Sequence, residues 1–93
     1  MTHFLVVATN RCGVLARITA IVSATGTNIR TAAAYPVAES DVAIVHLSVE
    51  SDAIIAERLR RKLMRIVEVI EVRAEVHEKT LSIDMGRYLE KTA

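Results

Sequence analysis

The sequence predicts one small α+β domain whose elements follow the order β-α-β-β-α-β. The chain has 93 residues, enough for one hydrophobic core and too few for two. Hydrophobic residues make up 52% of it and charged residues 25%, which is typical of globular proteins. Two segments carry apolar residues at helical spacing, and four show the short apolar runs or the alternation of strands.

The first two elements are a strand and a helix. Residues 4–8 form an unbroken apolar run before a turn at residues 9–13, which indicates a central strand covered on both faces. From residue 14 to 25, apolar residues recur every three or four positions, as on one face of a helix. We expect Asn10 to cap the start of this helix and Gly26 to follow its end in a left-handed conformation.

Two strands come next. Residues 28–37 alternate loosely between apolar and polar side chains around Pro36, which predicts an edge strand. Residues 38–41 are polar and form a turn. Residues 42–50 alternate more clearly, so one face of this strand is expected in the core. The core side of this third strand carries Ala43, Val45, Leu47 and Val49.

A second helix and a fourth strand complete the predicted domain. Ser51 or Asp52 is expected to cap a second helix. From Val69 to His77 the apolar period falls to two, which predicts a fourth strand whose apolar, core-facing side carries Ile70, Val72, Ala74 and Val76. The apolar stripe of the helix consists of Ile55, Leu59, Leu63 and Ile66, and its polar side carries a basic cluster at Arg58, Arg60, Arg61, Lys62 and Arg65.

Each helix has a single apolar stripe, so both are expected to cover the same face of a four-stranded antiparallel sheet. This is the ferredoxin-like architecture. Leu5, Val7 and Ile44 would then lie on the other, open face, where apolar side chains imply a partner. We assign residues 1–77 to this domain and residues 78–93 to a polar tail that forms a short helix or stays loose.

The composition argues against several classes of function. One Phe, two Tyr and no Trp leave few rings to stack on bases, and a net charge of +1 does not favour phosphate binding. Cys12 is the single cysteine, which rules out disulfides and multi-thiolate metal sites within one chain. His3, His46 and His77 fall on different strands, so we expect neither catalytic nor metal-binding residues. No apolar run is long enough to span a membrane, and we expect a soluble, cytoplasmic protein.

The loop after the first strand is the candidate ligand site. Its residues lead into a helix N-terminus, where backbone N–H groups and the helix dipole favour an anion. Gly13 allows the backbone to approach a carboxylate, and Asn28 stands at the head of the second strand. These groups suit an amino acid with an aliphatic side chain. An N-cap at Asn10 and a tight return at residues 26–28 would explain the same residues without a ligand.

Two short patterns resemble a known family. Asn10-x-x-Gly13-x-Leu15, followed by Gly26-x-Asn28-Ile29, is similar to the ligand-binding signature of ACT domains. Residues 62–72 resemble the second helix and last strand of the regulatory small subunit of acetolactate synthase, and the resemblance covers roughly residues 3–77.

The resemblance implies a non-catalytic protein that binds a branched-chain amino acid such as valine and regulates acetolactate synthase by feedback. In that family two chains pair with their sheets side by side, so a homodimer or higher oligomer is implied, with effector sites at the interface. Thiamine diphosphate, magnesium and flavin would belong to a separate catalytic subunit, and this chain would bind no cofactor. The implied effector-binding residues are Asn10, Arg11, Cys12, Gly13, Val14, Leu15, Asn28 and Ile29.

Within that set, the backbone N–H groups around Arg11 to Val14 would hold the carboxylate, and Leu15 would form part of the apolar wall. Thr9 departs from the family pattern, in which an acidic residue often precedes the asparagine. A second possibility is a free-standing amino-acid-binding ACT module that regulates another enzyme, a transporter or a transcription factor.

Overall fold

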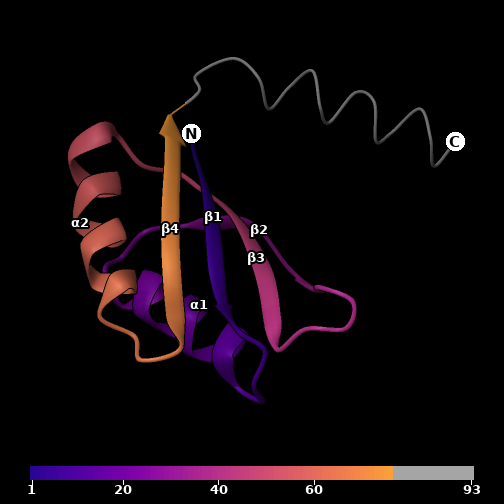
Figure 1. Cartoon of the computed structure of the whole chain (residues 1–93). Coiled ribbons are helices and arrows are strands. Elements are labelled where there is room, and N and C mark those ends of the chain that lie inside the picture. Colours follow the sequence, from indigo (N-terminus) through magenta and orange to yellow (C-terminus); the bar gives the residue numbers. More distant parts are fainter. Residues whose placement is uncertain (77–93) are drawn as a thin grey trace, which may run out of the picture.

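The computed structural model describes residues 1–76, which form a four-stranded antiparallel sheet with two helices on one face (Figure 1). The strand order across the sheet is β2-β3-β1-β4, which confirms the predicted ferredoxin-like arrangement. His77 and the tail assigned to residues 78–93 lie outside the described residues. The elements are β1 (Thr2–Thr9), α1 (Val14–Ala24), β2 (Ile29–Pro36), β3 (Val42–Val49), α2 (Ala53–Met64) and β4 (Val69–Val76).

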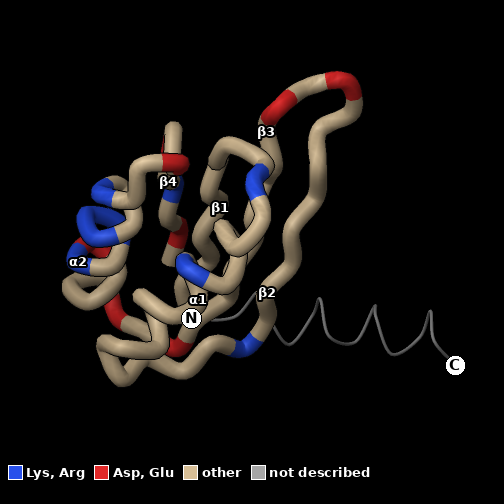
Figure 2. The backbone as a smooth tube through the Cα atoms, turned by 90° about the horizontal axis from the view of Figure 1, so that it is seen from below, with Lys and Arg blue, Asp and Glu red and all other residues tan. Residues whose placement is uncertain are grey.

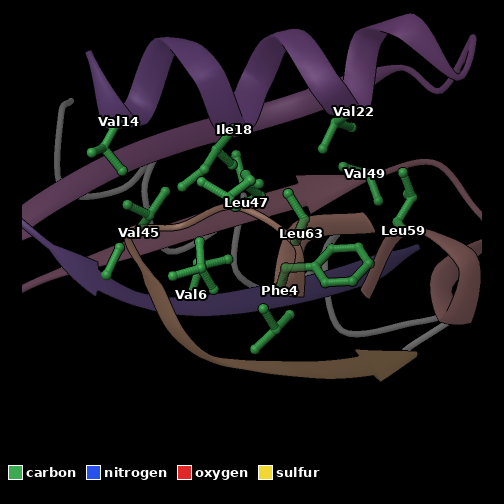
Figure 3. Packing of buried hydrophobic residues seen from close by; sticks show 14 of the residues in the cluster. Phe4, Val6, Val14, Ile18, Val22, Val45, Leu47, Val49, Leu59 and Leu63 are labelled. Atoms are coloured by element: carbon green, nitrogen blue, oxygen red, sulfur yellow. The ribbon is translucent and has the colours of Figure 1, made fainter. Parts of the chain in front are cut away.

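The core lies between the helices and one face of the sheet. In Figure 3, side chains from α1 and α2 point toward those of β1 and β3. Burying a side chain of this size contributes about 1.5–3 kcal/mol each, so this layer supplies most of the drive to fold. The fully buried members include Phe4 and Val6 of β1, Ile18 and Val22 of α1, Leu47 and Val49 of β3, and Leu59 and Leu63 of α2.

β1 is central, as predicted, but only one of its faces is fully covered by the described residues. Phe4 and Val6 on the helix side are buried, whereas Leu5 and Val7 on the other side are half-buried. Ile44 of β3 lies directly opposite Val7 on the same open face. The expectation of cover on both faces is therefore wrong for residues 1–76, and the expected orientation of these three side chains is confirmed.

α1 begins differently from the prediction. Gly13 occupies the N-cap position at φ 85°, and no side chain caps this helix. Asn10 stands three residues earlier and makes no capping hydrogen bond with its side chain, while its backbone N–H donates to the carbonyl of Asp41 at 2.6 Å. The expected cap at Asn10 is therefore wrong. At the other end, Thr25 is the C-cap and Gly26 follows at φ 78°, as predicted.

α2 begins at the cap expected from the sequence. The carboxylate of Asp52 accepts a hydrogen bond from the backbone N–H of Ile55 at 2.9 Å, so Asp52 is the cap and Ser51 is not. Ile55 itself is 37% exposed, whereas Ala56 is 3% exposed. The buried stripe therefore runs through Ala56 with the predicted Leu59, Leu63 and Ile66, and Ile55 lies at its margin.

The basic cluster lies along the outer side of α2, where Figure 2 shows it in blue. Glu57 pairs with Arg61 at 3.2 Å, as the spacing predicts, and also with Arg60 at 2.7 Å. The hydrogen bond from Arg60 lowers the pKa of Glu57 from 4.5 to about 2, with a further contribution from Arg61.

β4 departs from simple alternation because it contains a bulge. Val7 of β1 lies opposite Glu71, and the next residue, Ala8, lies opposite Val69. Ile70 is the extra residue between these pairs and is 56% exposed. The predicted core position of Ile70 is therefore wrong, and Val69 occupies the buried position instead.

β2 is an edge strand, as Pro36 predicted, since it pairs with β3 alone. Most of its side chains are exposed, including the helix-facing alanines Ala32 and Ala34. None of the helices within residues 1–76 has the length and apolar character needed to cross a membrane.

Candidate functional site

The loop between β1 and α1 is held in place from two sides. The backbone N–H of Thr9 donates to the carbonyl of Glu68 at 2.8 Å, and that of Asn10 donates to the carbonyl of Asp41 at 2.6 Å. Glu68 lies at the junction of α2 and β4, and Asp41 lies in the turn between β2 and β3. The loop therefore has a fixed backbone before it enters the helix.

A pocket of about 310 Å³ opens at this loop, between the start of α1 and strands β2 and β3. Its inner side is apolar because it is formed by side chains of Val, Leu and Ala, while the loop supplies polar groups at its rim. The residues that line it are Thr9, Asn10, Arg11, Gly13, Val14, Leu15, Ala16, Ala34, Ala43 and Val45.

Gly13 is required at this site by its backbone conformation. At φ 85° an L side chain is strained, although a Cβ there would meet no other atom within 4 Å. The first turn of α1 contains no acidic residue and no side-chain cap. The N-terminal end of this helix, with its partial positive charge, thus faces no negative side chain of its own first turn.

Five of the eight residues implied by the family resemblance lie together in the pocket lining: Asn10, Arg11, Gly13, Val14 and Leu15. Cys12 is exposed and is not among the residues that line the pocket.

Asn28 and Ile29 lie at the other end of the domain. Ile29 is opposite Val49, whereas the pocket end of β2 is marked by Pro36 opposite Ala43. β2 has eight residues, which corresponds to a span of roughly 23 Å. One chain therefore does not bring Asn28 to Asn10, and a site built from both requires a second chain.

Asn28 is part of a small polar cluster at its own end of β2. Its side-chain Nδ2 donates to Oε2 of Glu50 at 3.2 Å, and Arg30 Nη1 donates to Oε1 of the same carboxylate at 2.6 Å. The hydrogen bond from Arg30, and then that from Asn28, lowers the pKa of Glu50. Glu50 is therefore a carboxylate that stays ionised, and its side chain is 43% exposed.

Several residues of the site escaped the sequence analysis. Ala34 and Ala43 have small apolar side chains that carry no chemical motif, and they reach the pocket only through the pairing of β2 with β3. Glu68 is 51 residues from its ion-pair partner Arg17, so no local spacing links the two. The alternation of residues 42–50 was the one available signal, since it placed Ala43 and Val45 on the helix side.

The open sheet face brings two histidines together. The rings of His3 and His46 stack with their centroids 5.7 Å apart, and Oγ of Ser48 lies 2.9 Å from Nδ1 of His3. Within residues 1–76, no group of three or more His, Cys, Asp or Glu side chains is placed to hold a metal ion.

Most of the chain matches a known family of domains. Residues 4–71 match the family model described as the AHAS small subunit-like ACT domain. The chain belongs to this ACT-domain family. The family resemblance read from the two loop motifs is thus confirmed, over a stretch slightly shorter than residues 3–77. A comparison with curated proteins gave no match.

Solved structures share the fold of this ACT domain at low sequence identity. The ACT domain of GTP pyrophosphokinase from Chlorobium tepidum is 23% identical, with a TM-score of 0.66 over 80% of this chain and 95% of that one. The acetolactate synthase small subunit from Thermotoga maritima is 19% identical, with a TM-score of 0.69 over 80% of this chain. The match spans 47% of that subunit.

Proposed function

We propose that this ACT domain binds a free aliphatic amino acid of the branched-chain class, such as valine, in the pocket at the first loop. The observation that carries the proposal is the pocket itself, in which a polar rim at Asn10 and Arg11 meets an apolar inner side. An amino acid with an aliphatic side chain has the same division into a charged end and an apolar end. Binding would regulate a partner and involve no catalysis by this chain.

The carboxylate of the effector would lie at the N-terminal end of α1. Backbone N–H groups around residues 11–14 would hold it. Those of Arg11 and Val14 already donate to the carbonyls of Thr9 and Arg11, at 2.9 and 3.3 Å, so the N–H groups of Cys12 and Gly13 would be the donors. The absence of a side-chain cap and of acidic residues in this turn supports that position. Leu15 and Val14 would contact the aliphatic side chain.

A second copy of the chain would complete the site. Two chains related by a twofold axis, with their exposed β2 edges paired antiparallel, would place Asn28 of one chain at the Asn10 loop of the other. Glu50, which is hydrogen-bonded to Asn28, would then supply a negative charge for the ammonium group of the effector. The first loop offers no such charge at position 9, because Thr9 stands where an acidic residue often precedes the asparagine in this family.

The regulated partner in this proposal is the catalytic subunit of acetolactate synthase. Membership in the AHAS small subunit-like family supports it. A coupling of about 1–3 kcal/mol between effector binding and the assembly would change activity about 5- to 150-fold.

The alternative is an ACT module that serves a different target. The observation in its favour is the likeness to the ACT domain of GTP pyrophosphokinase, which spans 95% of that domain, against 47% of the acetolactate synthase small subunit. Affinity purification from a native lysate separates the two proposals. Recovery of a thiamine-diphosphate enzyme supports the acetolactate synthase partner. Recovery of a different enzyme, transporter or transcription factor without it supports the alternative.

Titration calorimetry with the twenty amino acids tests the effector. The wild-type protein is expected to bind a branched-chain amino acid, and Asn28→Ala is expected to abolish the heat of binding while circular dichroism stays unchanged. Thr31→Ala, an exposed substitution on the same strand, is the control. Binding that survives in Asn28→Ala at wild-type strength contradicts the shared site.

A further inference from the structure

The apolar floor of the pocket is built from two alanines and one valine. Ala34 of β2 lies directly opposite Val45 of β3, and both line the pocket together with Ala43. Val45 and Ala43 are 1% and 6% exposed, so their side chains are already packed in the core. Ala34 is exposed, because it lies on the edge strand, and contributes a single methyl group to the floor.

We propose that Ala34 sets the upper limit on the size of the effector's side chain. This inference rests on the proposed function, because it takes the occupant of the pocket to be an amino acid. With the carboxylate at the start of α1, the side chain of the effector extends toward the floor. Among the three floor residues, Ala34 alone is exposed, so a larger side chain there occupies the space of the ligand and does not displace the core.

The fold is expected to tolerate a larger residue at position 34. β-Branched side chains are favoured in strands, and an exposed position on an edge strand gives them room. Ala43 offers no such test, because at 6% exposure an added methyl group would overpack the core. Ala34→Val therefore changes the pocket and leaves the packing of the domain intact.

Ala32 supplies a matched control on the same strand. It lies two residues from Ala34, opposite Leu47, and therefore on the same helix-facing side of the sheet. It is also an exposed alanine, but it does not line the pocket. Ala32→Val introduces the same side chain, the same strand propensity and the same distance from the β2 edge.

The experiment is titration calorimetry of alanine, valine, isoleucine and leucine with the wild-type protein, Ala34→Val and Ala32→Val. One methylene group in an apolar pocket changes discrimination about 10- to 200-fold, and Ala34→Val adds two carbon atoms, so it is expected to weaken the larger amino acids relative to alanine by at least about 10-fold. Ala32→Val is expected to keep the wild-type order and ratios.

Different results would overturn the role of Ala34 and the proposed function. If the wild-type protein binds these amino acids and Ala34→Val leaves their affinity ratios unchanged, the role of Ala34 is overturned and the proposed function stands. Equal changes in Ala32→Val and Ala34→Val overturn it as well, because the effect then comes from the strand. If the wild-type protein binds none of the twenty amino acids, the proposed function fails and this inference fails with it.

Discussion

Arg17 and Glu68 join the first helix to the junction of α2 and β4. Arg17 Nη1 donates to both carboxylate oxygens of Glu68, at 2.7 and 2.8 Å. The carbonyl of Glu68 also accepts the N–H of Thr9, so one residue holds the first loop from the strand before it and from the helix after it. Its own backbone N–H, followed by Arg17, lowers the pKa of Glu68, which keeps the carboxylate charged.

Replacing Glu68 by Gln is expected to loosen the loop more than it destabilises the fold. The side chain of Arg17 is 50% exposed and that of Glu68 is 14% exposed, so solvent screens the pair on one side and the Tm should change only slightly. The backbone hydrogen bond from Thr9 is retained, but the link to α1 through Arg17 is lost. Amide hydrogen exchange at residues 10–13 should become faster, while exchange in β1 and β3 should stay unchanged. Unchanged exchange in the loop would show that Glu68 does not position it.

Glu57 is expected to titrate well below an ordinary glutamate. Its pKa is lowered from 4.5 to about 2, so its pairing with Arg60 stabilises the folded state above pH 4.5. That contribution is lost as the pH falls from about 4.5 to about 2. NMR titration of the Glu57 side-chain carboxyl measures the value directly. Arg60→Ala should move it back toward 4.5, whereas Arg58→Ala should leave it in place.

Leu63 tests the core between α2 and the sheet. Its side chain is 0% exposed, and truncation to Ala is expected to cost about 2–5 kcal/mol in the free energy of unfolding. Ile54 on the same helix is 68% exposed, and Ile54→Ala should change the free energy by no more than about 0.5 kcal/mol. Urea denaturation of both variants checks the contrast. Similar losses in the two would contradict the burial of this stripe.

Gly13 tests whether the loop depends on backbone conformation or on space. At φ 85° an alanine is strained by roughly 1–2 kcal/mol, although its Cβ would meet no neighbouring atom. Asparagine adopts positive φ more readily, so Gly13→Asn should recover part of the stability that Gly13→Ala loses. Chemical denaturation of the two variants gives the comparison, and equal stability of Gly13→Ala and the wild type would argue against the left-handed backbone.

Local spacing was enough to predict most of the fold. The four-residue steps through Val14, Ile18 and Val22 predicted α1, whose bounds at Val14 and Ala24 lie within one residue of the expected 14–25, although the cap expected at Asn10 is wrong. Helix and strand patterns depend on neighbours a few positions apart, which is why they can be read from a single sequence. The bulge at Ile70 could not be predicted from the sequence, because it arises from the pairing of β4 with β1.

Only the part of the candidate site that lies in the loop between β1 and α1 was predicted from the sequence. Asn10, Gly13 and Leu15 are close in sequence and share one loop, so their motif identified them together. Ala34 has no chemical signature, and the separation between Asn28 and Asn10 depends on the length and direction of β2. Residues that reach a site through strand pairing need the register of the sheet, which local patterns do not contain.

The two edge strands of the sheet, β2 and β4, differ in the side chains that they would present to a further strand. On β4, the irregular backbone and the charged side chains of Glu71, Arg73 and Glu75 disfavour docking of a further strand, in the way that natural sheets protect their margins. β2 also contains an irregularity, at Arg30 between Ile29 and Thr31, but from Thr31 to Pro36 it pairs regularly with β3 and carries three alanines. We therefore expect two copies of the chain to pair through β2 rather than β4, and a twofold contact that uses both β2 edges would end with two chains.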